Sequence, residues 1–115
     1  MSNSQQLGIA AEREALSYLR LQGLKLLCQN FHSRFGEIDL IMLDQSVTVF
    51  VEVKHRQSGL SAASESINYA KQQKLVKAAQ YYLLKSGGID VACRFDVVLL
   101  DGCGQKQWLK NVIIL

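Results

Sequence analysis

Two neighbouring segments of the chain alternate apolar and polar residues, and together they predict a β-hairpin. The first is residues 36–41 (GEIDLI), and the second is residues 49–54 (VFVEVK). Alternation with a period of two is typical of strands that are buried on at least one face. Residues 44–46 (DQS) supply turn-forming side chains between the two strands.

The same alternation decides which side chains share a face of this hairpin. Glu37 and Asp39 point to one side of the first strand, and Glu52 and Lys54 point together from the second. Three carboxylates and one ammonium are therefore expected to converge on one patch. The residues expected to point the other way, into a core, are Val47, Val49, Val51 and Val53.

Such a patch needs a chemical reason, because charged groups on a half-buried sheet are costly unless they are paired, solvated or bound to a metal ion. Asp39 and Glu52 would repel each other unless a cation lay between them. A hard divalent ion such as magnesium takes oxygen ligands and would resolve that conflict. Lys54 would then neutralise a phosphate or orient an attacking water. The alternative is an ordinary surface sheet face with a Lys–Glu pair.

Helical periodicity predicts an amphipathic helix over residues 4–21, closed by Gly23. Glu12 lies on the side of this helix that otherwise carries apolar residues. Two interpretations remain open. Glu12 either pairs with Arg13 or Lys25 at the edge of the stripe, or it supplies a third acidic ligand or holds metal-bound water.

The remaining segments complete the order helix, three strands, helix, two strands, which predicts one α/β domain over residues 1–115 with a mixed central sheet. The long helix between the third and fourth strands permits parallel pairing through a right-handed crossover. The expected segments are a strand over 24–31 with Asn30 entering a turn, a loop over 57–64, a helix over 62–85 that can break near 68–69, and strands over 91–100 and 108–115.

Basic residues gather around the second predicted helix. Between Lys54 and Lys85 there are six Lys or Arg residues and one acid, Glu65. A basic surface beside an acidic cleft suits an enzyme that grips a phosphate backbone, although an ordinary solvated helix face explains the charges equally well. Lys71 lies on an apolar stripe, where it either extends past its neighbours to water or enters the cleft. The candidate phosphate contacts are Arg56, Lys71, Lys74 and Lys77.

Three further features bear on the class of protein. The cysteines Cys28, Cys93 and Cys103 are far apart and odd in number, which indicates free thiols in a reducing cytoplasm. No apolar run is long enough to cross a bilayer, and the N-terminus is polar, so we expect a cytoplasmic protein without membrane attachment.

His55 is expected to be a plain surface residue. Asp96 is expected to pair with Arg94, and Trp108 to lie in the core or an interface.

The arrangement of Asp39, a gap, and then Glu52 and Lys54 resembles the signature of the PD-(D/E)XK nuclease superfamily. More narrowly, Asn30 and the blocks 36–41, 49–56 and 94–96 are similar to the YraN-type uncharacterised family, which resembles archaeal Holliday-junction resolvases. The match runs from about residue 8 to residue 98.

The chain departs from that family just after Asn30, where Phe31-His32 stands in place of the usual arginine. The departure bears on phosphate contact from that turn and leaves the metal site untouched.

The resemblance implies a restriction-endonuclease-like fold and a nuclease that depends on Mg²⁺ or Mn²⁺. Asp39 and Glu52 would bind the metal, with Glu12 completing the set, and Glu37 would support them from outside. The ion would polarise the scissile phosphate and activate water, while Lys54 would place that water or stabilise charge on phosphorus. The implied substrate is DNA, with branched or flap structures as candidates.

Two features leave other functions open. So small a domain covers little duplex, so a homodimer or a larger protein partner is expected if both strands are cut. The fold would also serve a non-catalytic nucleic-acid-binding module that uses the basic helix, or a protein-interaction module in which the charged cleft is incidental.

Overall fold

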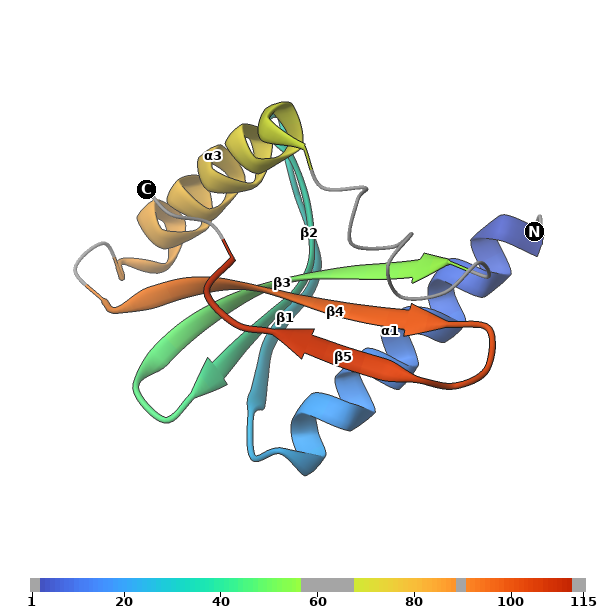
Figure 1. The fold of residues 1–115 in the computed structure, drawn as a ribbon. Coiled ribbons are helices and arrows are strands. Elements are labelled where there is room, and N and C mark those ends of the chain that lie inside the picture. Colours follow the sequence, from blue (N-terminus) through green and yellow to red (C-terminus); the bar gives the residue numbers. More distant parts are fainter. Residues whose placement is uncertain (1–2, 57–67, 89–90, 113–115) are drawn as a thin grey trace.

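The computed structural model describes residues 3–56, 68–88 and 91–112 of the chain. Within these ranges the elements are α1 (Asn3–Leu21), β1 (Lys25–Ser33), β2 (Gly36–Asp44), β3 (Val47–Arg56), α3 (Tyr69–Ser86), β4 (Cys93–Asp101) and β5 (Lys106–Leu109). Their order along the chain confirms the predicted α/β class and its sequence of helices and strands (Figure 1).

The five strands form one mixed sheet in which spatial order follows chain order, from β1 to β5. Neighbouring strands are antiparallel except β3 and β4, which are parallel. The segment between these two strands carries α3, so the parallel pairing that the long helix permits is confirmed. The arrangement is compatible with a restriction-endonuclease-like fold.

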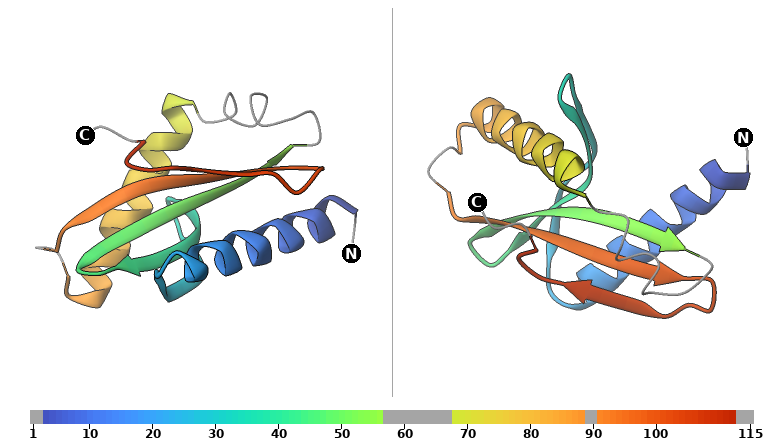
Figure 2. Two further views of the ribbon diagram at one scale, coloured as in Figure 1. Left: turned by 60° about the horizontal axis from the view of Figure 1, so that its bottom comes forward. Right: turned by 45° about the horizontal axis from the view of Figure 1, so that its top comes forward.

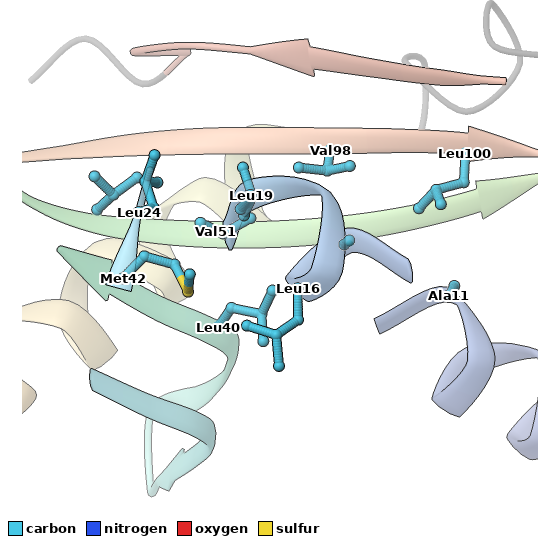
Figure 3. Packing of buried hydrophobic residues seen from close by; sticks show 11 residues of the cluster. Ala11, Leu16, Leu19, Leu24, Leu40, Met42, Val51, Val98 and Leu100 are labelled. Atoms are coloured by element: carbon cyan, nitrogen blue, oxygen red, sulfur yellow. The ribbon is translucent and has the colours of Figure 1, made fainter. Parts of the chain in front are cut away.

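Helices α1 and α3 cover opposite faces of the sheet (Figure 2). On one face Leu16 and Leu19 of α1 pack with Val51 and other buried side chains of the central strands (Figure 3). On the other face Phe50 lies in the cluster that includes Leu75 of α3. The alternation along β3 therefore sends its valines into a core, as predicted, and this core lies beneath α1, whereas Phe50 faces α3.

Both helices end as their sequences predict. Gly23 follows α1 with a φ of 98°, and Gly87 caps α3 with a φ of 72°, a left-handed conformation that glycine adopts without steric cost. α3 begins at its N-cap Asn68, whose Oδ1 accepts the N–H of Lys71 at 2.9 Å. The predicted helix thus begins at its expected break, while the loop over 57–64 and residues 62–67 lie outside the described residues. No helix in the described part of the chain is long and apolar enough to cross a bilayer.

Two predicted boundaries are wrong. The last strand, β5, ends at Leu109 because Asn111 turns with a φ of 56° and donates its N–H to Asp96. Asn30 does not enter a turn, since β1 continues to Ser33. The hairpin turns at Arg34 and Phe35 instead, where the Oγ of Ser33 accepts the N–H of Phe35 at 3.2 Å and donates to the carbonyl of Gly36 at 3.0 Å.

Candidate active site

Asp39 lies where β2 parts from β3. Backbone pairing between these strands runs from Asp44 and Val47 to Leu40 and Val51, and beyond this point β2 bends away (Figure 1). There the Oδ2 of Asp39 accepts the N–H of Val53 at 2.9 Å. A carboxylate thus satisfies a strand N–H group where the neighbouring strand has left.

A cleft with a volume of about 390 Å³ lies beside this point, between the N-terminal part of α1 and the far end of β3. All four predicted catalytic residues, Glu12, Asp39, Glu52 and Lys54, line it. His55 also lines it and is half-buried. Its signal in the sequence was its strand spacing from Val53, with which it shares a face. The other lining residues are Leu7, Gly8, Ala11 and Val53.

Glu12 projects a carboxylate into this cleft from α1. Its Oε1 atom is buried and has no hydrogen-bond partner within the described residues, although the residue as a whole is only half-buried. Burial raises the pKa of Glu12, and the negative charges of Glu37 and Glu52 raise it further. The alternative in which Glu12 pairs with Arg13 or Lys25 is not seen among the ion pairs of the described chain.

Asp39 is likewise a carboxyl group buried close to other negative charges. Burial and the nearby charge of Glu52 raise the pKa of Asp39 to about 7, against the opposing effect of its hydrogen bond from Val53. Half of such carboxyls are protonated near neutral pH, whereas an exposed aspartate would be fully ionised. The expected repulsion between Asp39 and Glu52 is therefore present at this site.

Glu52 is held by two lysines from different elements. Its side chain is 8 % exposed, and its Oε1 lies 3.2 Å from Nζ of Lys54 and 2.8 Å from Nζ of Lys71. Burial and the adjacent ammonium of Lys71 lower the pKa of Lys54. Burial alone would also lower the pKa of Lys71, but its hydrogen bond to Glu52 raises it. Lys71 therefore enters the site rather than extending to bulk water.

The donor set suits a hard divalent cation in type, since Glu12 offers an unpartnered carboxylate oxygen and Asp39 carries a pKa that a cation would lower. As the side chains lie, however, no group of three Asp, Glu, His or Cys residues among those described could hold a metal ion. Glu52 is turned to its two lysines, so a cation would have to compete with them for its oxygens.

Glu37 does not join this group, and the predicted convergence of three carboxylates on one patch is wrong in that respect. Its side chain is 64 % exposed and its Oε1 contacts Nδ1 of His32 at 3.1 Å, rather than Lys54. The bend of β2 separates it from β3, so simple alternation fails there. Its charge still acts on Glu12 through space.

Two other predicted phosphate contacts, Lys74 and Lys77, are not among the residues that line the cleft. Lys74 and Lys77 are exposed on α3, one and two turns beyond Lys71. The side chain of Arg56 lies outside the described residues.

Comparison with known proteins identifies the family. The profile of "Uncharacterised protein family UPF0102" matches residues 11–100. A UPF0102 protein of Psychromonas ingrahamii is 46% identical over 112 residues, which cover 96% of this chain and 89% of that protein. One from Pseudomonas putida strain W619 is 48% identical over 110 residues, covering 90% and 89%. One from Coxiella burnetii is 42% identical over 114 residues, covering 97% and 95%. The predicted YraN-type resemblance is thus confirmed, and the chain belongs to the UPF0102 family.

Proposed function

We propose that this protein is a metal-dependent nuclease that hydrolyses phosphodiester bonds in DNA. The observation that carries the proposal is that two carboxyl groups in the cleft are not satisfied by the described part of the chain. Glu12 has a buried oxygen without a hydrogen-bond partner, and Asp39 has a pKa of about 7. Groups perturbed in this way cluster at functional sites, because the free energy they cost is recovered when a ligand binds. A basic side chain, Lys54, lines the same cleft.

Each side chain has a distinct role in this proposal. Glu12, Asp39 and Glu52 would hold Mg²⁺ or Mn²⁺, and such an ion, when bound, polarises a phosphate and makes water a better nucleophile. Lys54 stabilises negative charge on the phosphate, and its lowered pKa lets Nζ exchange a proton more readily than an exposed lysine does. Lys71 orients the carboxylate of Glu52 through their 2.8 Å contact.

Cleavage of labelled DNA tests the proposal directly. Purified protein is mixed with single-stranded, duplex, flap and four-way-junction DNA in Mg²⁺, Mn²⁺ or chelator. We expect cleavage that requires the metal and is lost in both Glu52→Gln and Lys54→Ala. Glu14→Gln, which alters an exposed carboxylate two residues from Glu12, should leave it unchanged. Equal cleavage in chelator, or by Glu52→Gln, would contradict the proposal.

Binding of the metal alone supplies a readout that does not depend on activity. A ligand that binds only the folded state raises the melting temperature according to its affinity and concentration. Mg²⁺ or Mn²⁺ should therefore stabilise the wild type, and Asp39→Asn should remove most of that stabilisation. An equal metal-induced shift in the variant would show that Asp39 is not a ligand.

A second candidate is a non-catalytic nucleic-acid-binding module, which the charge of α3 favours. This helix carries Lys71, Lys74, Lys77 and Lys85 and has neither Asp nor Glu. The module would bind nucleic acid in chelator, and its affinity would fall steeply with salt. Binding without cleavage in any metal would support it over the nuclease, or point to an enzyme that needs a second copy or a larger partner.

A further inference from the structure

A surface on the α3 side of the sheet combines aromatic and basic side chains from two elements. Figure 2 shows the β1–β2 hairpin standing beside α3. Their adjacent side chains form what we call the hairpin–helix surface. It consists of Arg34 and Phe35 from the hairpin turn and of Lys74, Lys77, Tyr81 and Lys85 from α3.

Tyr81 connects the two halves of this surface. Its ring centroid lies 6.3 Å from that of Phe35 and 6.1 Å from that of Phe31. Cations lie over the rings, with Cζ of Arg34 at 4.9 Å from the Phe35 centroid and Nζ of Lys85 at 5.4 Å from the Tyr81 centroid. Both rings are only half-buried and both cations are exposed, so a ligand can reach the aromatic groups by displacing flexible side chains.

The basic residues of α3 follow one side of the helix. Lys74, Lys77, Tyr81 and Lys85 are three or four residues apart, the spacing that brings side chains to a common face. The hairpin lies against this row, since a Cβ built on Gly36 would be 3.6 Å from the Cβ of Lys74. Aromatic and basic groups are therefore continuous across the two elements.

The row also begins at the active site. Lys71, one turn before Lys74, contacts Glu52 at 2.8 Å. From Lys71 to Lys85 the helix rises about 21 Å at 1.5 Å per residue. Lys71 therefore connects Glu52, which lines the cleft, to the row that runs along α3 toward Tyr81.

We propose that the hairpin–helix surface binds a single-stranded segment of nucleic acid, with unpaired bases stacked on Phe35 and Tyr81 and phosphates held by Lys74, Lys77 and Lys85. Aromatic side chains beside a basic track are the means by which proteins hold single strands, because every base has a π face. In a duplex these faces are covered by neighbouring bases. The inference rests on the proposed function, for which it names the substrate class: nucleic acid with an unpaired segment beside the cleavage point.

Packing of the hairpin against α3 explains the rings but not the cations. Like charges three or four residues apart destabilise a helix by a few tenths of a kcal/mol per pair, roughly as much as opposite charges stabilise it. Lys71 is paired with Glu52, but Lys74 and Lys77 stand three residues apart, and the helix that carries them has neither Asp nor Glu. A polyanion lying along the row removes this repulsion, whereas a purely structural role leaves it uncompensated.

Binding in chelator, where no metal-dependent cleavage occurs, tests the inference. Fluorescence anisotropy with the full chain compares labelled oligo(dT), oligo(U) and a blunt DNA duplex. We expect single strands to bind more tightly than duplex, and the double variant Phe35→Leu/Tyr81→Leu to lose about tenfold or more in single-strand affinity, from the usual strength of base–aromatic stacking. Duplex affinity should change by less than about twofold. The oligo(dT) and oligo(U) arms decide between DNA and RNA.

Two matched variants separate stacking from folding and from general charge. Tyr81→Phe keeps the ring and should retain single-strand affinity. Arg20→Gln/Lys25→Gln removes two exposed cations outside the surface and should have a much smaller effect than Lys77→Gln/Lys85→Gln, which removes two within it. Equal effects of the two charge variants would show that binding is diffuse, and would overturn the inference.

Photocrosslinking gives the position directly. Oligonucleotides that carry 5-iodouracil react with aromatic side chains on which the base stacks, and mass spectrometry should find the crosslink at Phe35 or Tyr81. Crosslinks confined to other residues, unchanged affinity in Phe35→Leu/Tyr81→Leu, or no single-strand binding at all would each overturn the inference. None of these outcomes decides the nuclease, because cleavage in metal and its loss in Glu52→Gln are measured separately.

Discussion

Two clusters of buried carboxylates lie in the same sheet, one at Asp96 on β4 and the other at Asp39 on β2. The Asp96 side chain is fully buried, yet donors surround it. Nε of Arg94 lies 3.1 Å from each of its oxygens, Nε1 of Trp108 donates at 2.8 Å, and the N–H of Asn111 donates at 2.9 Å. A second nitrogen of Arg94 reaches Asp44 at 2.9 Å, so the cation is paired as well.

The cluster at Asp39 has no such balance. Asp39 receives one backbone hydrogen bond, Glu12 has an oxygen without a partner in the described chain, and the positive groups are drawn to Glu52. The first cluster joins β4, β5 and the end of β2 and so serves the fold. The second faces a cleft and is suited to a ligand that is not part of the chain. Burial alone does not distinguish them, whereas hydrogen-bond satisfaction does.

Removing the carboxylate of the satisfied cluster should have the largest effect on stability. Asp96→Ala leaves Arg94 without its buried partner and should lower the free energy of unfolding by roughly 3–5 kcal/mol. Urea denaturation measures the loss, with the exposed Glu14→Ala as a control that should stay within about 0.5 kcal/mol. If the urea midpoint of Asp96→Ala moves no further than that of Glu14→Ala, the Asp96 cluster does not stabilise the fold in the way proposed.

The unsatisfied cluster should instead make stability depend on pH. The folded pKa of Asp39 is about 7 and its ordinary value is 3.8, so its contribution is fully present below about pH 4 and is lost as pH rises through 7. At 1.36 kcal/mol per unit the loss is at most about 4 kcal/mol. Asp39→Asn cannot ionise and should flatten the profile between about pH 4 and pH 8 in chelator. Parallel profiles for the two proteins would show that the carboxyl titrates normally.

A smaller change to the satisfied cluster sharpens the comparison. Trp108→Phe removes one donor to Asp96, while a ring remains to pack edge-on against Tyr18. A hydrogen bond to a charged group typically contributes about 2 kcal/mol, so the free energy of unfolding should fall by about that amount. Circular dichroism must follow the unfolding, since the variant has no tryptophan. A fully neutral substitution would indicate that Arg94 and Asn111 alone satisfy Asp96.

The smallest expected change in the free energy of unfolding is an increase rather than a decrease. Glu12→Leu removes a buried oxygen that has no partner, and should raise stability by about 1 kcal/mol while abolishing cleavage. A thermal melt and the DNA cleavage assay measure the two effects in the same preparation. Loss of stability comparable to that of Asp96→Ala would mean that Glu12 also serves the fold.

Much of the fold could be predicted because the pattern that encodes it is local. Period-two alternation over 36–41 and 49–54 identifies β2 and β3, and the two-glycine stop after Ser86 ends α3 where it is expected. The end of β5 could not be predicted, because it depends on a hydrogen bond from Asn111 to Asp96 on another strand. Nothing near Leu109 in the sequence signals that contact.

The candidate site shows the same division. Glu52 and Lys54 are two residues apart on one face of a strand, so their contact can be predicted from the sequence. Lys71 reaches Glu52 only because α3 packs across the sheet, and residue type alone left its role open. Glu37 was misplaced because β2 bends where it leaves β3, a tertiary effect that alternation does not encode.

Because the backbone N–H of Val53 donates to Asp39, this amide can report on the state of the Asp39 carboxylate. Most strand amides are shielded from hydrogen exchange by a neighbouring backbone carbonyl, which does not titrate or bind cations. The N–H of Val53 is instead protected by the carboxylate of Asp39, which can both titrate and bind a cation. A cation that draws Asp39 away should therefore speed deuterium uptake at Val53 even as it stabilises the protein as a whole, and one nuclear magnetic resonance signal would follow occupancy of the cleft without any substrate present.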